Sequence, residues 1–123
     1  MEKIFIETNY SPVIAVLKIL LYLFEGNKEL KVEVNQIEEI GDEYFEKDGE
    51  KLFLKTGSIL NLEDFLSFII RRYQINNLNI IIIENNSEII NIKLEDSEVL
   101  NFNGKIEKKV KDFIENYLST YLY

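Results

Sequence analysis

The sequence contains no cysteine and no histidine, and these two absences remove much of the chemistry that proteins commonly use. Without cysteine there are no disulfides, no thiolate metal sites and no cysteine nucleophiles. Without histidine the chain lacks the side chain best suited to proton transfer near neutral pH, which is also the commonest metal ligand. A serine–histidine–aspartate triad is therefore excluded.

Glycine and proline are also scarce, with five glycines and one proline among 123 residues. The glycines never have the spacing of a phosphate-binding or dinucleotide-binding loop, so we expect no nucleotide cofactor. No linker rich in proline or serine divides the chain, and residues 1–123 are expected to form a single domain. These absences predict a protein that is not an enzyme and that uses no cofactor. A small enzyme working through carboxylates is the one catalytic class left open.

The longest apolar run, residues 13–24, is interrupted only by Lys18. A membrane-spanning helix needs about 20 apolar residues, so this run is too short to cross a bilayer. Its flanks also lack the cationic start and small-residue cleavage site of a signal peptide. We therefore expect a buried helix and a cytoplasmic protein that makes no membrane contact.

The spacing of apolar residues predicts an α/β or α+β fold: a mixed sheet of about five to six strands with three helices, in the order βαβ-ββα-ββα. Asp48-Gly49 and Asn85-Asn86 each stand between apolar runs and predict hairpin turns. The expected strands are 3–7, 30–34, both halves of 44–55, 80–83 and 90–94, and the expected helices are 12–24, 61–72 and 106–122. The first and last helices are apolar over wide faces, which favours a homodimer.

Acidic residues exceed basic ones by 22 to 14, and most of the excess lies in one stretch, residues 33–50. This acidic segment holds eight carboxylates and only one base, Lys47. A patch of one sign attracts partners of the opposite charge. The residues predicted to bind a partner are Glu38, Glu39, Asp42, Glu43, Glu46, Asp48 and Glu50.

The leading functional hypothesis is a non-enzymatic interaction protein whose acidic segment binds a protein partner with a basic surface. Inhibitors, immunity proteins and nucleic-acid decoys act in this way, whereas direct nucleic-acid binding needs clustered lysine and arginine. One alternative is that the acids only keep a solvated loop soluble. A cluster of Mg²⁺ or Ca²⁺ ligands is another use for the acids, but they lack the ligand spacing of an EF-hand, and we expect no metal. A basic cluster at Lys105, Lys108, Lys109 and Lys111 is a further candidate to meet the segment, within one molecule or across a dimer.

Short motifs in the first seventy residues resemble the thioredoxin-like N-terminal half of glutathione-transferase-like domains. They are a first strand ending at Glu7, the sequence Tyr10-Ser11-Pro12 before a long apolar helix, and a hairpin at Asp48-Gly49 that leads into residues 56–60. The resemblance implies that Tyr10 or Ser11 occupies the position that activates a thiol in such domains. It also implies an all-helical second half. Residues 79–95 depart from this expectation, because their pattern predicts two strands. The corresponding alternative function is an adaptor or structural subunit that docks through apolar helix faces.

Overall fold

Alternating apolar and polar residues build most of the strands in the computed structural model, which describes residues 2–7, 12–41, 44–70, 72–95, 99–104 and 106–115. Within these ranges the chain forms eight strands and three helices. Their bounds are β1 (Glu2–Glu7), α1 (Pro12–Gly26), β2 (Lys31–Gly41), β3 (Tyr44–Lys47), β4 (Glu50–Phe53), β5 (Ile59–Asn61), α2 (Leu62–Ile69), β6 (Arg72–Glu84), β7 (Ser87–Glu95), β8 (Val99–Gly104) and α3 (Lys108–Phe113).

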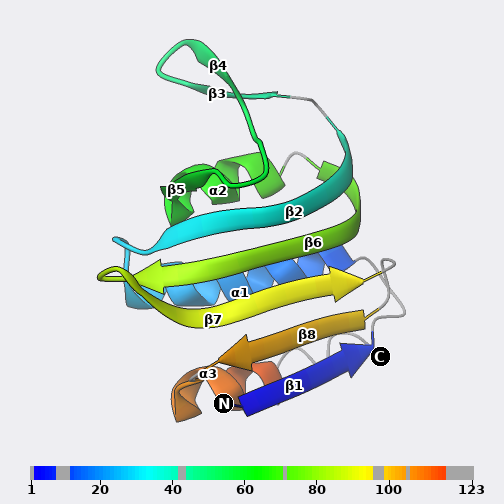
Figure 1. The fold of residues 1–123 in the computed structure, drawn as a ribbon, viewed down its shortest axis with the longest axis vertical. Coiled ribbons are helices and arrows are strands. Elements are labelled where there is room, and N and C mark those ends of the chain that lie inside the picture. Colours follow the sequence, from blue (N-terminus) through cyan, green and yellow to red (C-terminus); the bar gives the residue numbers. More distant parts are fainter. Residues whose placement is uncertain are drawn as a thin grey trace.

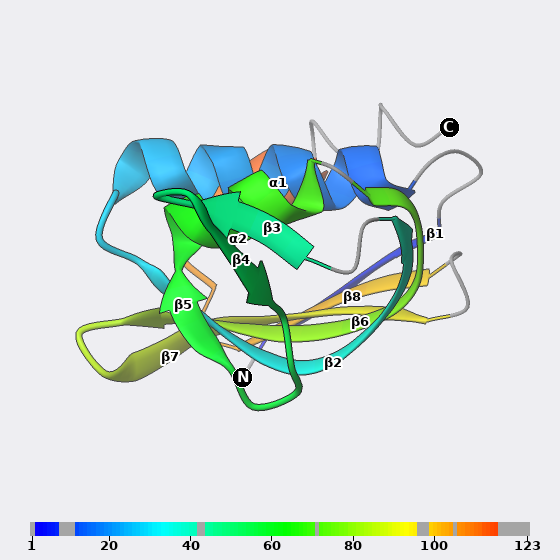
Figure 2. The ribbon, with the colours of Figure 1, turned by 90° about the horizontal axis from the view of Figure 1, so that it is seen from above.

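Six of these strands form one sheet in the order β1-β8-β7-β6-β2-β5, while β3 and β4 pair separately. The three helices lie on one face of the sheet, and the other face carries no described element (Figures 1 and 2). The expected α+β class with three helices is confirmed. The expectation of a mixed sheet is wrong, because every pairing among the described strands is antiparallel. β1 and β2 run in the same direction, but the β6-β7-β8 meander separates them.

The core lies between the sheet and the helices. Ile80 and Ile82 of β6 and Ile92 of β7 are fully buried on the helix side, where α1 lies across β6 and β7 (Figure 1). The neighbouring Ile81 is only half-buried, since successive side chains of a strand point to opposite faces. The run 80–83 is thus a central strand, as predicted, with one face covered rather than two.

The helices begin where the sequence predicts. α1 starts at Pro12 and ends at Gly26, and α2 follows Asn61, its N-cap residue. The predicted end of α2 is wrong, because the helix stops at Ile69 and Arg72 already belongs to β6. The last helix, α3, runs from Lys108 to Phe113, and the chain is described as far as Glu115. The rest of the predicted helix, residues 116–122, lies outside the described residues.

Three features of the sheet differ from the predicted strands. β2 continues to Gly41, so the first part of the acidic segment is a strand and not a loop. β5 and β8 were not predicted; β8 completes the sheet by pairing with both β1 and β7. Both predicted hairpin turns are confirmed, with positive φ at Asp48 (52°), Asn85 (50°) and Asn86 (66°).

Candidate interaction surface

The first half of the acidic segment lies along a strand edge that is only partly covered. β5 pairs with β2 from Lys31 to Glu33, and Val34 then exchanges backbone hydrogen bonds with Ser58 and Gly57 at 2.9 and 2.6 Å. Beyond Val34, β6 is the only described strand that pairs with β2. The outer edge of β2 from residue 36 to 41 therefore has no strand partner in the described part of the chain.

This edge of β2 is irregular and acidic. Its pairing with β6 shifts register between Val34 and Gln36, again between Glu38 and Glu39, and once more before Gly41. Such bulges increase the local twist and are one of the means by which edge strands avoid pairing with other copies. The Glu38 side chain is exposed, and its Oε2 accepts a hydrogen bond of 3.1 Å from Nδ2 of Asn77 on β6. One carboxylate of the edge is therefore held in place while facing solvent.

The second half of the segment is the β3–β4 hairpin, which forms its own two-stranded sheet. It extends beyond the six-stranded sheet, past α2, at the top of Figure 1. Asp48 and Gly49, at φ 52° and 80°, make the turn, a left-handed geometry that favours Asp-Gly. Asp48 and Glu50 are exposed at this tip.

The hairpin itself is nearly balanced in charge. In the backbone register Glu46 stands opposite Lys51, and Lys47 stands opposite Glu50. Residues 44–53 hold three acids and two bases, whereas residues 33–43 hold five acids and no base. A count that stops at residue 50 leaves out Lys51 and overstates the charge of the hairpin. The strongest negative charge therefore lies on β2 and the residues that follow it.

The structure describes the backbone of five of the seven predicted binding residues. Glu38, Asp48 and Glu50 are exposed. Glu39 lies in β2 and Glu46 in β3, with the backbone position described for both. Asp42 and Glu43 lie outside the described residues.

Two alternative uses of the acids can be compared with the fold. Among the residues that the structure describes, no group of three acidic side chains is close enough to hold a metal ion. The basic cluster does not meet the acidic segment within one molecule: α3, with Lys108, Lys109 and Lys111, lies at the opposite end of the sheet from the hairpin (Figure 1). Lys105 lies outside the described residues.

Comparisons of the chain with protein-family models, with curated proteins and with solved structures give no match. The resemblance to glutathione-transferase-like domains implied an all-helical second half, but that half contains the strands β6, β7 and β8. Tyr10 and Ser11, the positions matched to thiol activation, lie outside the described residues. None of the described helices combines the length and the apolar composition that a membrane crossing requires. Inference about function therefore rests on the geometry of this chain alone.

Proposed function

We propose that the protein is a non-enzymatic interaction protein that binds a basic protein surface through its acidic segment, residues 33–50. The observation that carries the proposal is that Glu38 lies on a strand edge with which no described strand pairs, while Asp48 and Glu50 lie at a hairpin tip. All three side chains are exposed, so their carboxylates are accessible to a partner.

The fold also supports a mode of binding. Beyond Val34 the backbone of β2 presents an outer edge to which an extended segment of a partner can add as a further strand. A second copy of the same edge brings like charges into register, which destabilises the pairing. A partner segment that carries lysine or arginine brings opposite charges instead. The acids of β2 therefore select basic partners and disfavour self-association.

The test is a pull-down from native lysate with the wild type and two variants of equal net charge. One variant reverses two acids of the segment (E38K with E39K), and the matched control reverses two acids elsewhere on β7 and in the loop before β2 (E88K with E29K). Glu88 and Glu29 are exposed, so the control changes charge without disturbing the core. We expect a partner that the wild type and the control retain and the segment variant loses.

Ionic strength provides a second readout. Electrostatic docking weakens steeply with added salt, because the Debye length falls from about 10 Å at 0.1 M to about 3 Å at 1 M. In the pull-down, loss of the partner from both variants to the same extent would assign binding to net charge. Retention of the partner by the segment variant would make residues 33–50 a solubilising surface.

A second candidate function, an adaptor or homodimer that docks through an apolar helix face, rests on a different observation. Ile14 and Leu21 of α1 are 45% and 43% exposed. Residues seven apart lie on one face of a helix, so the two side chains form a small apolar surface. Docking there would be almost insensitive to salt and would be lost in the variant I14E with L21E, which leaves the acidic segment intact. Light scattering of the purified protein measures the homodimer directly.

A further inference from the structure

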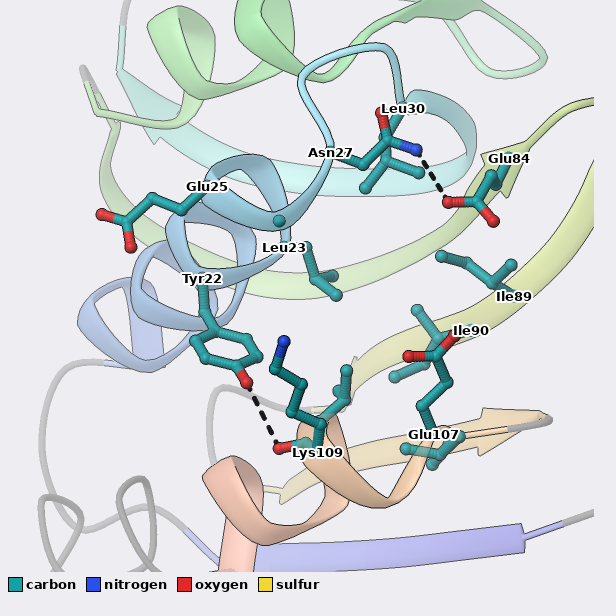
Figure 3. Close-up of a pocket in the computed structure, with 13 residues that line it drawn as sticks. Tyr22, Leu23, Glu25, Asn27, Leu30, Glu84, Ile89, Ile90, Glu107 and Lys109 are labelled. Atoms are coloured by element: carbon teal, nitrogen blue, oxygen red, sulfur yellow. Dashed lines mark hydrogen bonds between the residues drawn. The ribbon is translucent and has the colours of Figure 1, made fainter.

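A cavity of about 400 Å³ lies at the opposite end of β2 from its acidic half. Its walls come from the end of α1 and the loop after it, from the end of β6 and the first half of β7, and from the start of α3 with the two residues before it (Figure 3). A volume of this order is typical of sites for small molecules.

The inner wall of this cavity is apolar. Six aliphatic side chains form it, of which four are buried in the core and two are half-buried: Leu23, Leu30, Ile90, Ile106, Ile89 and Val110. An apolar ligand body that covers this wall displaces water from it, which is favourable in proportion to the area covered. The wall therefore favours a ligand with an aliphatic or aromatic body.

Charged groups of opposite sign flank the apolar wall. Figure 3 shows the Lys109 ammonium on the Tyr22 side of the cavity and the carboxylates of Glu84 and Glu107 on the other side. Oε2 of Glu84 accepts a 2.7 Å hydrogen bond from Nδ2 of Asn27, which fixes the direction of this carboxylate. Within the described part of the chain, no ion pair joins Lys109 to either carboxylate.

The side of the cavity that carries Lys109 is rigidly built. The ring of Tyr22 stacks on Phe113, with centroids 4.1 Å apart and planes inclined by 13°. The Tyr22 hydroxyl donates a hydrogen bond of 3.4 Å to the backbone carbonyl of Lys109. These contacts join α1 to α3 and hold the backbone from which the Lys109 side chain extends.

We propose that this cavity binds a small zwitterion whose ammonium and carboxylate are separated by an apolar body, the chemistry of a short apolar peptide with free termini. The ammonium of the ligand faces Glu84 and Glu107, its carboxylate faces Lys109, and its side chains cover the aliphatic wall. Hydrogen bonds between ionised groups are stronger than neutral ones, so each terminus contributes to affinity. The site is independent of the acidic segment and goes beyond the proposed binding of a basic protein.

The test uses the dipeptide Leu-Leu and two capped forms as probes, with affinity measured by titration calorimetry at low salt. N-acetyl-Leu-Leu lacks the ammonium, and Leu-Leu amide lacks the carboxylate. We expect each capped probe to bind about tenfold more weakly than Leu-Leu, which corresponds to the loss of one charge-assisted contact. Leucine carries both charges on a single carbon and is expected to bind more weakly than the dipeptide.

Single variants assign each terminus to its side chain. K109Q is expected to remove the preference for Leu-Leu over the amide, and E107Q, which leaves Glu84 in place, is expected to reduce the preference over the acetylated probe. E25Q is the matched control for E107Q, because the Glu25 carboxylate points away from the cavity in Figure 3 and the two variants make the same change of charge. Glu107, Lys109 and Glu25 are all exposed, so the three substitutions leave the core intact.

Several results would overturn the proposal. They are the absence of Leu-Leu binding at millimolar concentration, equal affinity for all probes, equal affinity for leucine, or K109Q and E107Q behaving like E25Q. Methyl resonances give an independent measurement on the wild type: Leu23, Ile90 and Val110 must shift when Leu-Leu is added. Shifts confined to other parts of the protein would place the ligand elsewhere and contradict the assignment.

Discussion

Asn101 on β8 is a buried polar side chain whose replacement should stabilise the protein. It is 5% exposed, and its side-chain oxygen Oδ1 has no hydrogen-bond partner within the described residues. Leu100 and Phe102 on either side are buried toward the helices, so Asn101 points to the opposite face of the sheet. The register places it beside Lys93 of β7. We predict that the variant N101L, which has the same number of side-chain heavy atoms, is more stable than the wild type.

The magnitude follows from the cost of an unmade hydrogen bond. A buried acceptor without a partner costs about 1–3 kcal/mol, and leucine removes that cost. We expect the free energy of unfolding to rise by about 1–2 kcal/mol. For a chain of this length that is a rise in melting temperature of roughly 4–8 °C. Urea denaturation monitored by circular dichroism measures both the midpoint and the slope.

Asn91 provides a matched control one strand away. Its Nδ2 donates to Oδ1 of Asn79 at 2.7 Å and to the backbone oxygen of Ile80 at 2.8 Å. The variant N91L makes the same chemical change, but it breaks both bonds and is expected to lose about 1–2 kcal/mol. Leucine has a higher strand propensity than asparagine at both positions, so propensity shifts the stability of both variants in the same direction. A gain of stability in N101L together with a loss in N91L therefore reflects hydrogen bonding. If N101L lost as much stability as N91L, the Asn101 oxygen would have to be hydrogen-bonded in solution, and the reasoning would be refuted.

Two further predictions concern the backbone. Gly104 has φ 131°, and a Cβ there would lie 3.0 Å from the backbone oxygen of Ile89, so G104A should lose about 2 kcal/mol in urea denaturation. G26A is its control: a Cβ at Gly26 meets nothing within 4 Å, and we expect no loss of stability, so an equal loss in both variants would contradict the steric argument. N27A should lose about 1–2 kcal/mol, because Asn27 donates to Glu84 at 2.7 Å and its Oδ1 accepts from the backbone of Glu29 at 2.9 Å. Stability equal to the wild type would show that this link between α1 and β6 is dispensable.

The sequence predicted the elements whose pattern is strong and local. The start of α1 at Pro12, the hairpin turns and the apolar run 80–83 all depend on neighbouring residues, and the structure confirms them. β8 has the opposite character: its six residues include two asparagines and a glycine, which are rare in strands. It is a strand because β1 and β7 pair with it on both sides. A pairing such as Glu2 with Gly104 joins the first described strand to the last, and no local pattern contains that information.

The candidate sites show the same limit. The charge of the acidic segment could be counted from sequence, but its extension as a strand depends on pairing with β6, since glutamate does not favour strands by itself. The cross-strand register that sets Lys51 against Glu46 appears only in the folded hairpin. The cavity draws on three separate parts of the chain, residues 22–30, 84–90 and 106–110, and none of them contains a motif. Of its charged side chains the sequence singles out only Lys109, as one of a basic cluster, and the position of Lys109 across the cavity from Glu84 depends on how α3 packs against α1.

The edge of β2 explains why so much charge is concentrated in so few residues. An unpaired edge in a sheet this rich in isoleucine would readily pair with another copy of itself. Bulges at three points and carboxylates along the edge both oppose that pairing. Protection against self-association alone would be served equally well by lysine, the residue most often used at edges. Residues 33–43 contain five acids and no lysine, a choice of sign that protection does not require. The basic partner that we propose would account for the sign. Replacing the acids by lysine separates the two roles, since we expect that variant to keep the protection and to lose the partner.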